Sequence, residues 1–116
     1  MPRSTEDYLQ DILRATETIT ARIDELTEAA FFADDVLVDS ILFNLVAIGE
    51  ACNHLPAALR AQHPDVEWAV IVAMRNRIVH GYWDVNPTII WETIQQNIPQ
   101  LRDQMRSLLQ DFRDEQ

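Results

Sequence analysis

The sequence contains no lysine, only two glycines and a single cysteine among its 116 residues. Without lysine, chemistry that needs a lysine amine, such as Schiff-base formation, is excluded. The two separate glycines, Gly49 and Gly81, cannot form a glycine-rich phosphate loop or a dinucleotide fingerprint. The lone Cys52 excludes an intramolecular disulfide and a multi-cysteine metal site. Its apolar neighbours in the sequence indicate a small core residue.

Positive charge is also scarce. All nine positive charges are arginines, and 19 acidic residues give the chain a formal net charge of −10. Affinity for nucleic acid comes largely from neutralised phosphates, so the chain as a whole is a poor general binder of nucleic acid. Contact with RNA would have to rely on a few concentrated arginines.

The sequence has no long hydrophobic run. Met1 to Ser4 lead into no apolar stretch, so we expect no signal peptide. The most apolar segment, residues 36–55, is interrupted by polar and charged residues and is too polar to span a membrane. Hydrophobic residues make up 47% and charged residues 24%, as is ordinary for a soluble protein. We therefore expect one cytoplasmic domain over residues 1–116.

Apolar residues recur at spacings of three and four, which is typical of amphipathic helices. Ser4 and Asp34 to Asp35 are candidate N-caps, and Gly81 is a candidate left-handed helix end. No segment alternates as a strand would. The sequence predicts an all-α, antiparallel four-helix bundle with a short extra helical turn. The expected helices are residues 4–26, 36–55, 56–62, 68–80 and 87–112, the last kinked or divided at Pro99.

Arg75 is the first residue that does not fit a plain bundle. On a helical wheel of residues 68–80 it falls inside the broad apolar arc, where a guanidinium is costly unless paired. Glu50 on the preceding long helix is its natural partner. Asn76 and His80 share the opposite face at a spacing of four. Arg75 and His80 are about 140° apart, so they converge only if the helix ends at His80 or a second subunit completes the site.

Each of these residues also has a purely structural interpretation. His80 could interact with the helix dipole at the C-terminus, and Arg75 could serve only to hold Glu50. Arg77 is interpreted as a solvated charge, Tyr82 and Trp83 as lid aromatics, and His54 and His63 as structural or surface groups.

Two further groups also have structural interpretations. Phe31 and Phe32 are expected to cover one end of the bundle, and Asp34, Asp35 and Asp39 are expected to form a helix cap rather than a metal site.

The run MRNRIVHGY at residues 74–82 contains an arginine, four residues, a histidine, one residue and a tyrosine. It is flanked by IGEA at 48–51, LP at 55–56, WDVN at 83–86 and IWET at 90–93. Together, over about residues 4–112, these blocks resemble the HepT-like toxins of the HEPN superfamily, a group of small helical ribonucleases.

The resemblance implies a metal-independent endoribonuclease without a cofactor, acting as a homodimer whose two Arg-x4-His segments line one cleft. Attack by a ribose 2′-hydroxyl requires RNA rather than DNA. On this resemblance, Arg75 holds the scissile phosphate, with Arg77 as a further RNA contact, and His80 is the acid/base group. Asn76 and Glu50 are supporting residues, and Asn76 could orient the phosphate or the imidazole.

The same resemblance implies a partner, a minimal nucleotidyltransferase antitoxin that attaches AMP to the tyrosine of the motif. That residue is Tyr82 here, and the added phosphate would compete for Arg75 and block substrate. The alternative is a non-catalytic helical subunit that binds a nucleotidyltransferase or a nucleotide. The complete motif favours the ribonuclease, whereas the acidic charge favours the alternative or a narrow substrate range.

Overall fold

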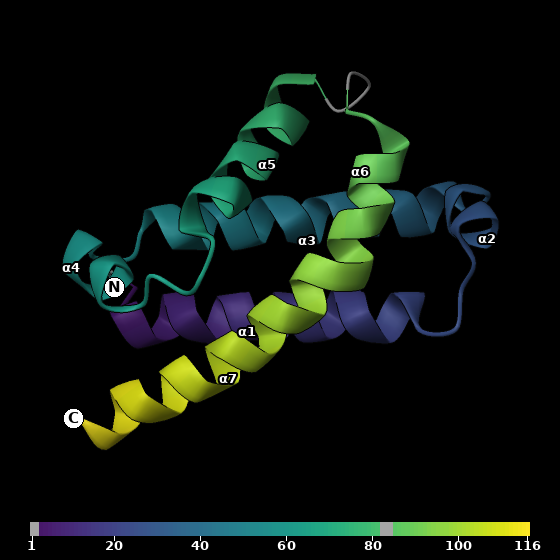
Figure 1. Cartoon of the computed structure of the whole chain (residues 1–116). Coiled ribbons are helices and arrows are strands. Elements are labelled where there is room, and N and C mark those ends of the chain that lie inside the picture. Colours follow the sequence, from purple (N-terminus) through teal and green to yellow (C-terminus); the bar gives the residue numbers. More distant parts are fainter. Residues whose placement is uncertain (1–2, 82–84) are drawn as a thin grey trace.

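The computed structural model describes residues 3–81 and 85–116, and all regular secondary structure in these ranges is helical. The four long helices are α1 (Thr5–Ile23), α3 (Asp35–Asn53), α5 (Trp68–Gly81) and α7 (Ile98–Asp114). Shorter elements connect them: α2 (Glu28–Phe32), α4 (Ala57–Gln62), α6 (Pro87–Glu92) and η2, a π-helical turn at Thr93–Asn97. The prediction of an all-α bundle with a short extra helical turn is confirmed (Figure 1).

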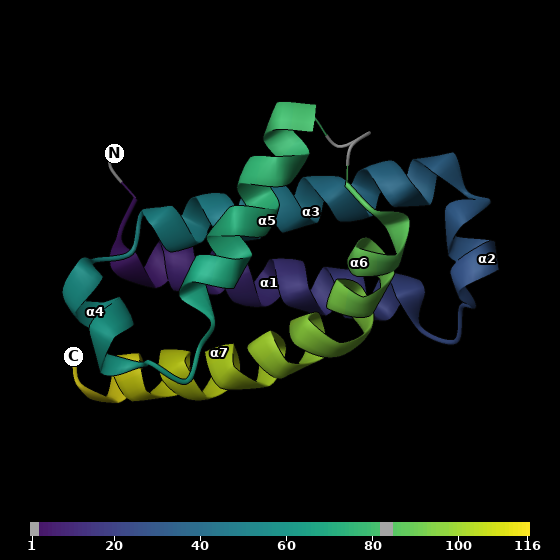
Figure 2. The ribbon, with the colours of Figure 1, turned by 45° about the horizontal axis from the view of Figure 1, so that its top comes forward.

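The helices pack around α1 and α3, which lie side by side and run in opposite directions (Figures 1 and 2). On one side α7 packs against α1, and on the other α5 crosses α3. The two halves of the chain therefore meet along α1 and α3. This arrangement places α5, which carries the Arg-x4-His segment, on the outside of the bundle, with its main packing against α3.

The first helix, α1, begins where the sequence predicts but ends three residues earlier than predicted. The Ser4 hydroxyl accepts a hydrogen bond from the Asp7 N–H, and the Asp7 carboxylate accepts one from the Ser4 N–H. These bonds favour the ionised carboxylate and lower the pKa of Asp7 below its ordinary value. The helix stops at Ile23 rather than Leu26, because the chain turns there and Glu25 adopts a left-handed φ of 63°.

The central helix α3 is capped by Asp34, whose carboxylate accepts a hydrogen bond from the Leu37 N–H. It packs against α1 on one side and α5 on the other, as its nearly continuous apolar sequence predicts. Two of its large apolar residues remain outside the core. Val36 is 80% exposed and Phe43 is 72% exposed, and their spacing of seven places them on one helix face.

The end of α5 differs from the prediction. The sequence predicts a left-handed Gly81 just beyond the helix, but Gly81 is the last residue of α5 and has no positive φ. The helix thus continues one residue past His80. Gly81 is also buried, so its small size rather than left-handed freedom suits this position. Near the other end of α5, the Trp68 indole N–H lies within hydrogen-bond distance of the Arg60 and His63 carbonyls and ties α5 to α4.

The last helical region is divided near Pro99, as predicted. Asn86 caps α6, and Pro87 occupies its first turn. The π-helical turn η2 follows, in which the Ile98 N–H donates a hydrogen bond to the Thr93 carbonyl. Pro99 has no N–H to continue an α-helical ladder, so the wider π turn directly before it accommodates the change.

The core is made of aliphatic residues from all the long helices, with Phe31 closing one end. The Phe31 ring meets Phe32 edge-on and lies 5.5 Å from the Trp91 ring, which confirms the expected aromatic cover. Cys52 is fully buried, as predicted, and this burial raises the pKa of its thiol to about 12. Among the helices formed by residues 3–81 and 85–116, none has the length and apolarity that crossing a membrane requires.

Candidate functional site

The site is organised by the crossing of α3 and α5. At the crossing, the backbone of Gly49 on α3 faces Arg75 on α5. A Cβ placed on Gly49 would lie 2.2 Å from the Arg75 Cβ and 2.7 Å from its Cγ. Such distances are far below van der Waals contact, so only glycine allows this approach. The glycine of the IGEA block thus sets how closely the arginine-bearing helix packs.

The close approach directs the Arg75 guanidinium toward the next residue of α3. Its Nη2 donates to the Glu50 Oε2 at 2.9 Å, and its Nη1 donates to the Asn76 Oδ1 at 2.9 Å. The pairing with Glu50 expected from the helix faces is therefore present. It resolves the anomaly of an arginine in the apolar arc, because the aliphatic part packs and the charged end is paired at the surface.

The Arg75 side chain remains 26% exposed. Its Nε is buried and has no hydrogen-bond partner within residues 3–81 and 85–116. A guanidinium has five N–H donors, of which one faces Glu50, one faces Asn76 and one is the buried Nε. Two donors are left, one on each terminal nitrogen. Arg75 can therefore offer both terminal nitrogens to an anion while Glu50 and Asn76 hold its plane.

His54 belongs to this cluster, although the sequence indicates only a separate structural or surface group. Its Nε2 lies 3.3 Å from the Glu50 Oε1, so Glu50 contacts Arg75 with one oxygen and His54 with the other. The His54 ring stacks on Tyr8 of α1 at 4.8 Å with an interplanar angle of 7°. His54 is half-exposed, as a surface group should be. The signal that would have linked it to the site is its spacing of four from Glu50.

His80 and Arg77 are exposed at the C-terminal end of α5, where they line a shallow depression with Gly81 and Val85. No hydrogen bond joins His80 to Arg75 in the described part of the chain. This agrees with their different directions on the helical wheel. Asn76 is held by Arg75 rather than by His80. Tyr82 and Trp83, expected beside this end of the helix, lie outside the described residues.

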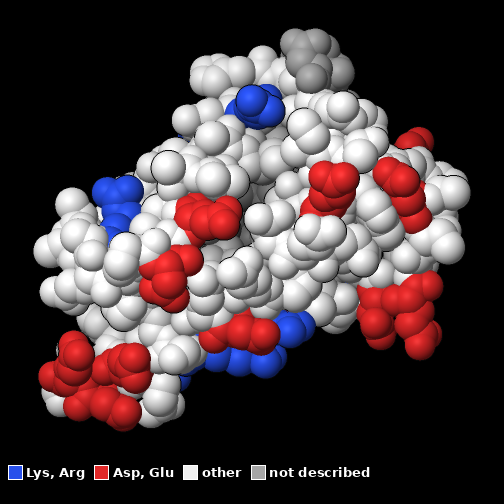
Figure 3. All heavy atoms as spheres, viewed as in Figure 1, with Lys and Arg blue, Asp and Glu red and all other residues white. Residues whose placement is uncertain are grey.

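The surroundings are acidic, as the composition predicts. On the face in Figure 3, groups of acidic side chains outnumber groups of arginines. Several arginines away from α5 are already paired with carboxylates: Arg3 with Asp11, Arg102 with Asp103, Arg106 with Glu17 and Arg113 with Glu6. These pairs offset part of the positive charge elsewhere on the molecule. On α5, Arg77 is exposed two residues after Arg75, and the terminal nitrogens of Arg75 keep two donors, so α5 is a candidate helix for phosphate contact.

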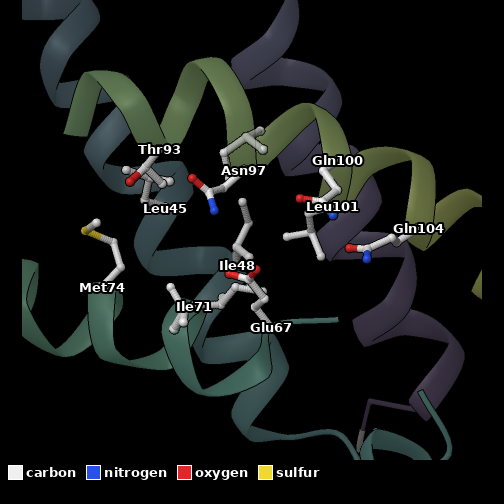
Figure 4. A pocket seen from close by; sticks show the side chains of 12 residues that line it. Leu45, Ile48, Glu67, Ile71, Met74, Thr93, Asn97, Gln100, Leu101 and Gln104 are labelled. Atoms are coloured by element: carbon white, nitrogen blue, oxygen red, sulfur yellow. The ribbon is translucent and has the colours of Figure 1, made fainter. Parts of the chain in front are cut away.

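A second hollow lies between α5 and the η2–α7 region, with α3 behind it (Figure 4). Ile71 and Met74 of α5 face Asn97 and Leu101 across it. Its surface is largely apolar, and it contains none of the site residues that the sequence predicts. This hollow is therefore separate from the cluster around Arg75. Within the described ranges, no group of three or more histidine, cysteine or carboxylate side chains is arranged to hold a metal ion.

Comparison with known proteins bears on this site. Residues 12–108 match the family model described as "Ribonuclease HepT-like". The chain belongs to the ribonuclease HepT-like family. The resemblance carried by the motif is thereby confirmed, and the match covers α3 and α5 with all the residues of the Arg75 cluster except Tyr8.

Relatives of this HepT-like chain span nearly its whole length. It is 37% identical over 108 residues to a candidate RNase of Caldanaerobacter subterraneus subsp. tengcongensis, covering 93% of this chain and 96% of that protein. It is 32% identical over 108 residues to a candidate ribonuclease HepT of Thermococcus cleftensis, covering 93% and 98%. A candidate RNase of Methanocaldococcus jannaschii is 24% identical over 110 residues, with 95% of each chain covered. No solved structure matches the chain significantly.

Proposed function

We propose that this HepT-like chain is a metal-independent endoribonuclease that cleaves RNA by attack of a ribose 2′-hydroxyl. The observation that carries the proposal is the state of Arg75, whose guanidinium is held by Glu50 and Asn76 with two terminal donors left over. An arginine fixed in this way can bind a phosphate with both terminal nitrogens. The names of the relatives as ribonucleases support the same conclusion.

His80 is the acid/base group of the proposed reaction. A neutral imidazole takes the proton of the 2′-hydroxyl as the 2′-oxygen bonds to phosphorus. The bond from phosphorus to the 5′-oxygen breaks, and a protonated imidazole gives that oxygen its proton. The products are a 2′,3′-cyclic phosphate and a 5′-hydroxyl. Because the nucleophile belongs to the substrate, no metal ion is needed to activate water.

Arg75 stabilises the charge that develops on the phosphate oxygens in the transition state. Asn76 keeps the guanidinium plane in place, and Arg77 adds a further cation on the same helix. Since Arg75 and His80 point in different directions on α5, one protomer presents them as separate groups. A twofold dimer would bring a second copy of each residue to the same groove.

The homodimer is therefore part of the proposal. The exposed face of α3 with Val36 and Phe43 supports it, because large apolar side chains this exposed are commonly covered by a partner. Two copies of Arg75 and Arg77 would concentrate four cations in one place on an otherwise acidic molecule. Such a site fits selective rather than general binding of RNA.

The second part of the proposal concerns control by a nucleotidyltransferase antitoxin. In this scheme the Tyr82 oxygen attacks the α-phosphate of ATP, releases pyrophosphate and leaves AMP on the tyrosine. The added negative charge would neutralise Arg75 and obstruct the groove. Mass spectrometry after incubation with a minimal nucleotidyltransferase, ATP and Mg²⁺ tests this step. Added AMP in the wild type and none in Tyr82→Phe is expected, and equal addition to both would refute Tyr82 as the acceptor.

One observation favours a non-catalytic binding subunit as the second candidate. Arg75 is already paired with Glu50, as it would be if its role were only to hold α5 on α3. The experiment that separates the two functions incubates the purified protein with RNA in EDTA. The ribonuclease proposal expects fragments ending in 2′,3′-cyclic phosphates and no cleavage of a 2′-deoxy substrate. Intact RNA would favour the second candidate, and fragments with other ends would refute attack by the 2′-hydroxyl.

A further inference from the structure

Glu50 stands between two groups that carry positive charge, Arg75 of α5 and His54 at the end of α3. Its Oε2 accepts from the Arg75 Nη2 at 2.9 Å, and its Oε1 lies 3.3 Å from the His54 Nε2. The carboxylate is therefore shared. A guanidinium carries its charge at all pH values that proteins tolerate, whereas an imidazole gains or loses its charge near neutrality.

The position of His54 is fixed from its other side. Its ring stacks on Tyr8 at 4.8 Å, and the Arg3 guanidinium lies over the same tyrosine at 5.4 Å from the ring centre. Arg3 is in turn paired with Asp11. The titratable and charged groups around His54 are thus Glu50 on the preceding helix α3, Tyr8 and Asp11 on α1, and Arg3 before α1. Of these, only Glu50 also contacts Arg75.

We infer that His54 is a positioning residue for Arg75, and that its charge determines through Glu50 how strongly Arg75 binds a phosphate of RNA. When His54 is protonated, the net charge of Arg75, Glu50 and His54 together is +1, and Glu50 forms an ion pair on each side. With His54 neutral, the carboxylate cancels the charge of Arg75, and the group as a whole is neutral. This inference rests on the proposed function, because it names RNA phosphate as the ligand of Arg75.

The effect falls on binding rather than on proton transfer. His54 contacts Glu50 and not His80, so it leaves the acid/base group unchanged and acts only through the charge of Arg75. Glu50 and His54 are each about half-exposed, at 49% and 50% of their side-chain surface. Water and salt therefore screen the interaction, and the change in affinity is about two- to fivefold, as for other exposed charge pairs.

Two substitutions separate charge from shape at position 54. His54→Gln keeps a neutral donor for Glu50 at every pH, and His54→Arg supplies a permanent charge at the same spacing of four. The probe is a fluorescein-labelled 2′-O-methyl RNA of random sequence, which has no 2′-hydroxyl to react. Its dissociation constant is measured by fluorescence anisotropy at low salt, at about pH 5.5 and about pH 8.

We expect the wild type to bind about two- to fivefold more tightly than His54→Gln at the lower pH, and the two affinities to converge at the higher pH. His54→Arg should bind the RNA with the tighter affinity at both pH values. His63→Gln is the matched control, because its side chain is remote from Glu50 along the chain and should follow the wild type. Equal pH dependence in the wild type and His54→Gln would overturn the inference.

A second readout does not depend on RNA. The buried Nε–H of Arg75 should exchange slowly enough to be followed by NMR. In protein carrying His80→Gln, so that His80 cannot contribute, its signal should shift between about pH 5.5 and about pH 8. Adding His54→Gln or Glu50→Gln should abolish the shift. If the shift persists in both, the inference is wrong. If the coupling is present but RNA is neither bound nor cut, the proposed function fails and the coupling stands.

Discussion

Gly49 and Arg75 are in contact so close that no other residue fits at position 49. A Cβ at that position would lie 2.2 Å from the Arg75 Cβ, so any side chain on α3 there would displace the backbone of α5. The Arg75 Cβ cannot move aside by changing rotamer, because it is attached directly to the backbone. The spacing of the two helices, and with it the reach of Arg75 to Glu50, therefore depends on the missing Cβ.

Gly49→Ala should destabilise the protein and disturb the site together. Overpacking of this kind costs about 1–3 kcal/mol, which exceeds the gain of alanine over glycine in a helix. Chemical denaturation measures the loss, and RNA cleavage at a temperature where the variant is folded measures the effect on Arg75. In the double variant Gly49→Ala/Arg75→Gly the clash is absent. The loss in the free energy of unfolding of the double variant should therefore be smaller than the sum of the losses in the two single variants. Simple additivity would show that the contact does not control the helix spacing.

Arg75→Lys should abolish most of the activity with little change in stability. A lysine ammonium cannot contact Glu50 and Asn76 and still present two fixed donors, because it is a point charge on a flexible stem. We expect the cleavage rate to fall by about a hundredfold, in the range seen when one transition-state donor is removed. Thermal unfolding of the variant should remain within a few degrees of the wild type. Full activity in Arg75→Lys would mean that positive charge alone is sufficient.

Cys52 should be inert in the native protein. Its side chain has no exposed surface, and burial raises the pKa of the thiol to about 12, so almost no thiolate exists at neutral pH. A thiol reagent such as dithionitrobenzoate should react only after denaturant is added. Rapid reaction under native conditions would show that α3 opens near its C-terminal end.

Phe43→Asp should produce a monomer if the exposed face of α3 forms the twofold contact. The side chain is 72% exposed in the protomer, so the substitution removes no core contact and should leave the circular dichroism spectrum unchanged. Sedimentation velocity should show a dimer for the wild type and for Phe43→Leu, and a monomer for Phe43→Asp. A stable dimer in all three would place the interface elsewhere.

The sequence is most informative where the pattern is local. The N-cap at Ser4, the cap at Asp34, the buried Cys52 and the division near Pro99 follow from neighbouring residues and are present. The pairing of Arg75 with Glu50 is also predictable, because a guanidinium within an apolar arc needs a carboxylate from the helix that it packs on.

Other features depend on how helices meet and cannot be derived from one helix at a time. The tight contact at Gly49 requires the register of α5 on α3, whereas the sequence shows that glycine only as part of a motif. The place of His54 depends on Tyr8 of α1. The prediction for Gly81 is wrong because glycine after a helix is often left-handed, whereas here the helix continues through it.

The central claim, that Arg75 and His80 form an RNA-cleaving site, is tested most directly by one comparison of cleavage rates in EDTA. His80→Ala is measured beside the wild type and beside His63→Ala, a histidine outside the cluster. Circular dichroism and sedimentation verify that all three proteins have the same fold and assembly. The account predicts that the wild type and His63→Ala cut RNA equally and that His80→Ala is slower by about a hundredfold or more. Equal rates in the wild type and His80→Ala would contradict it.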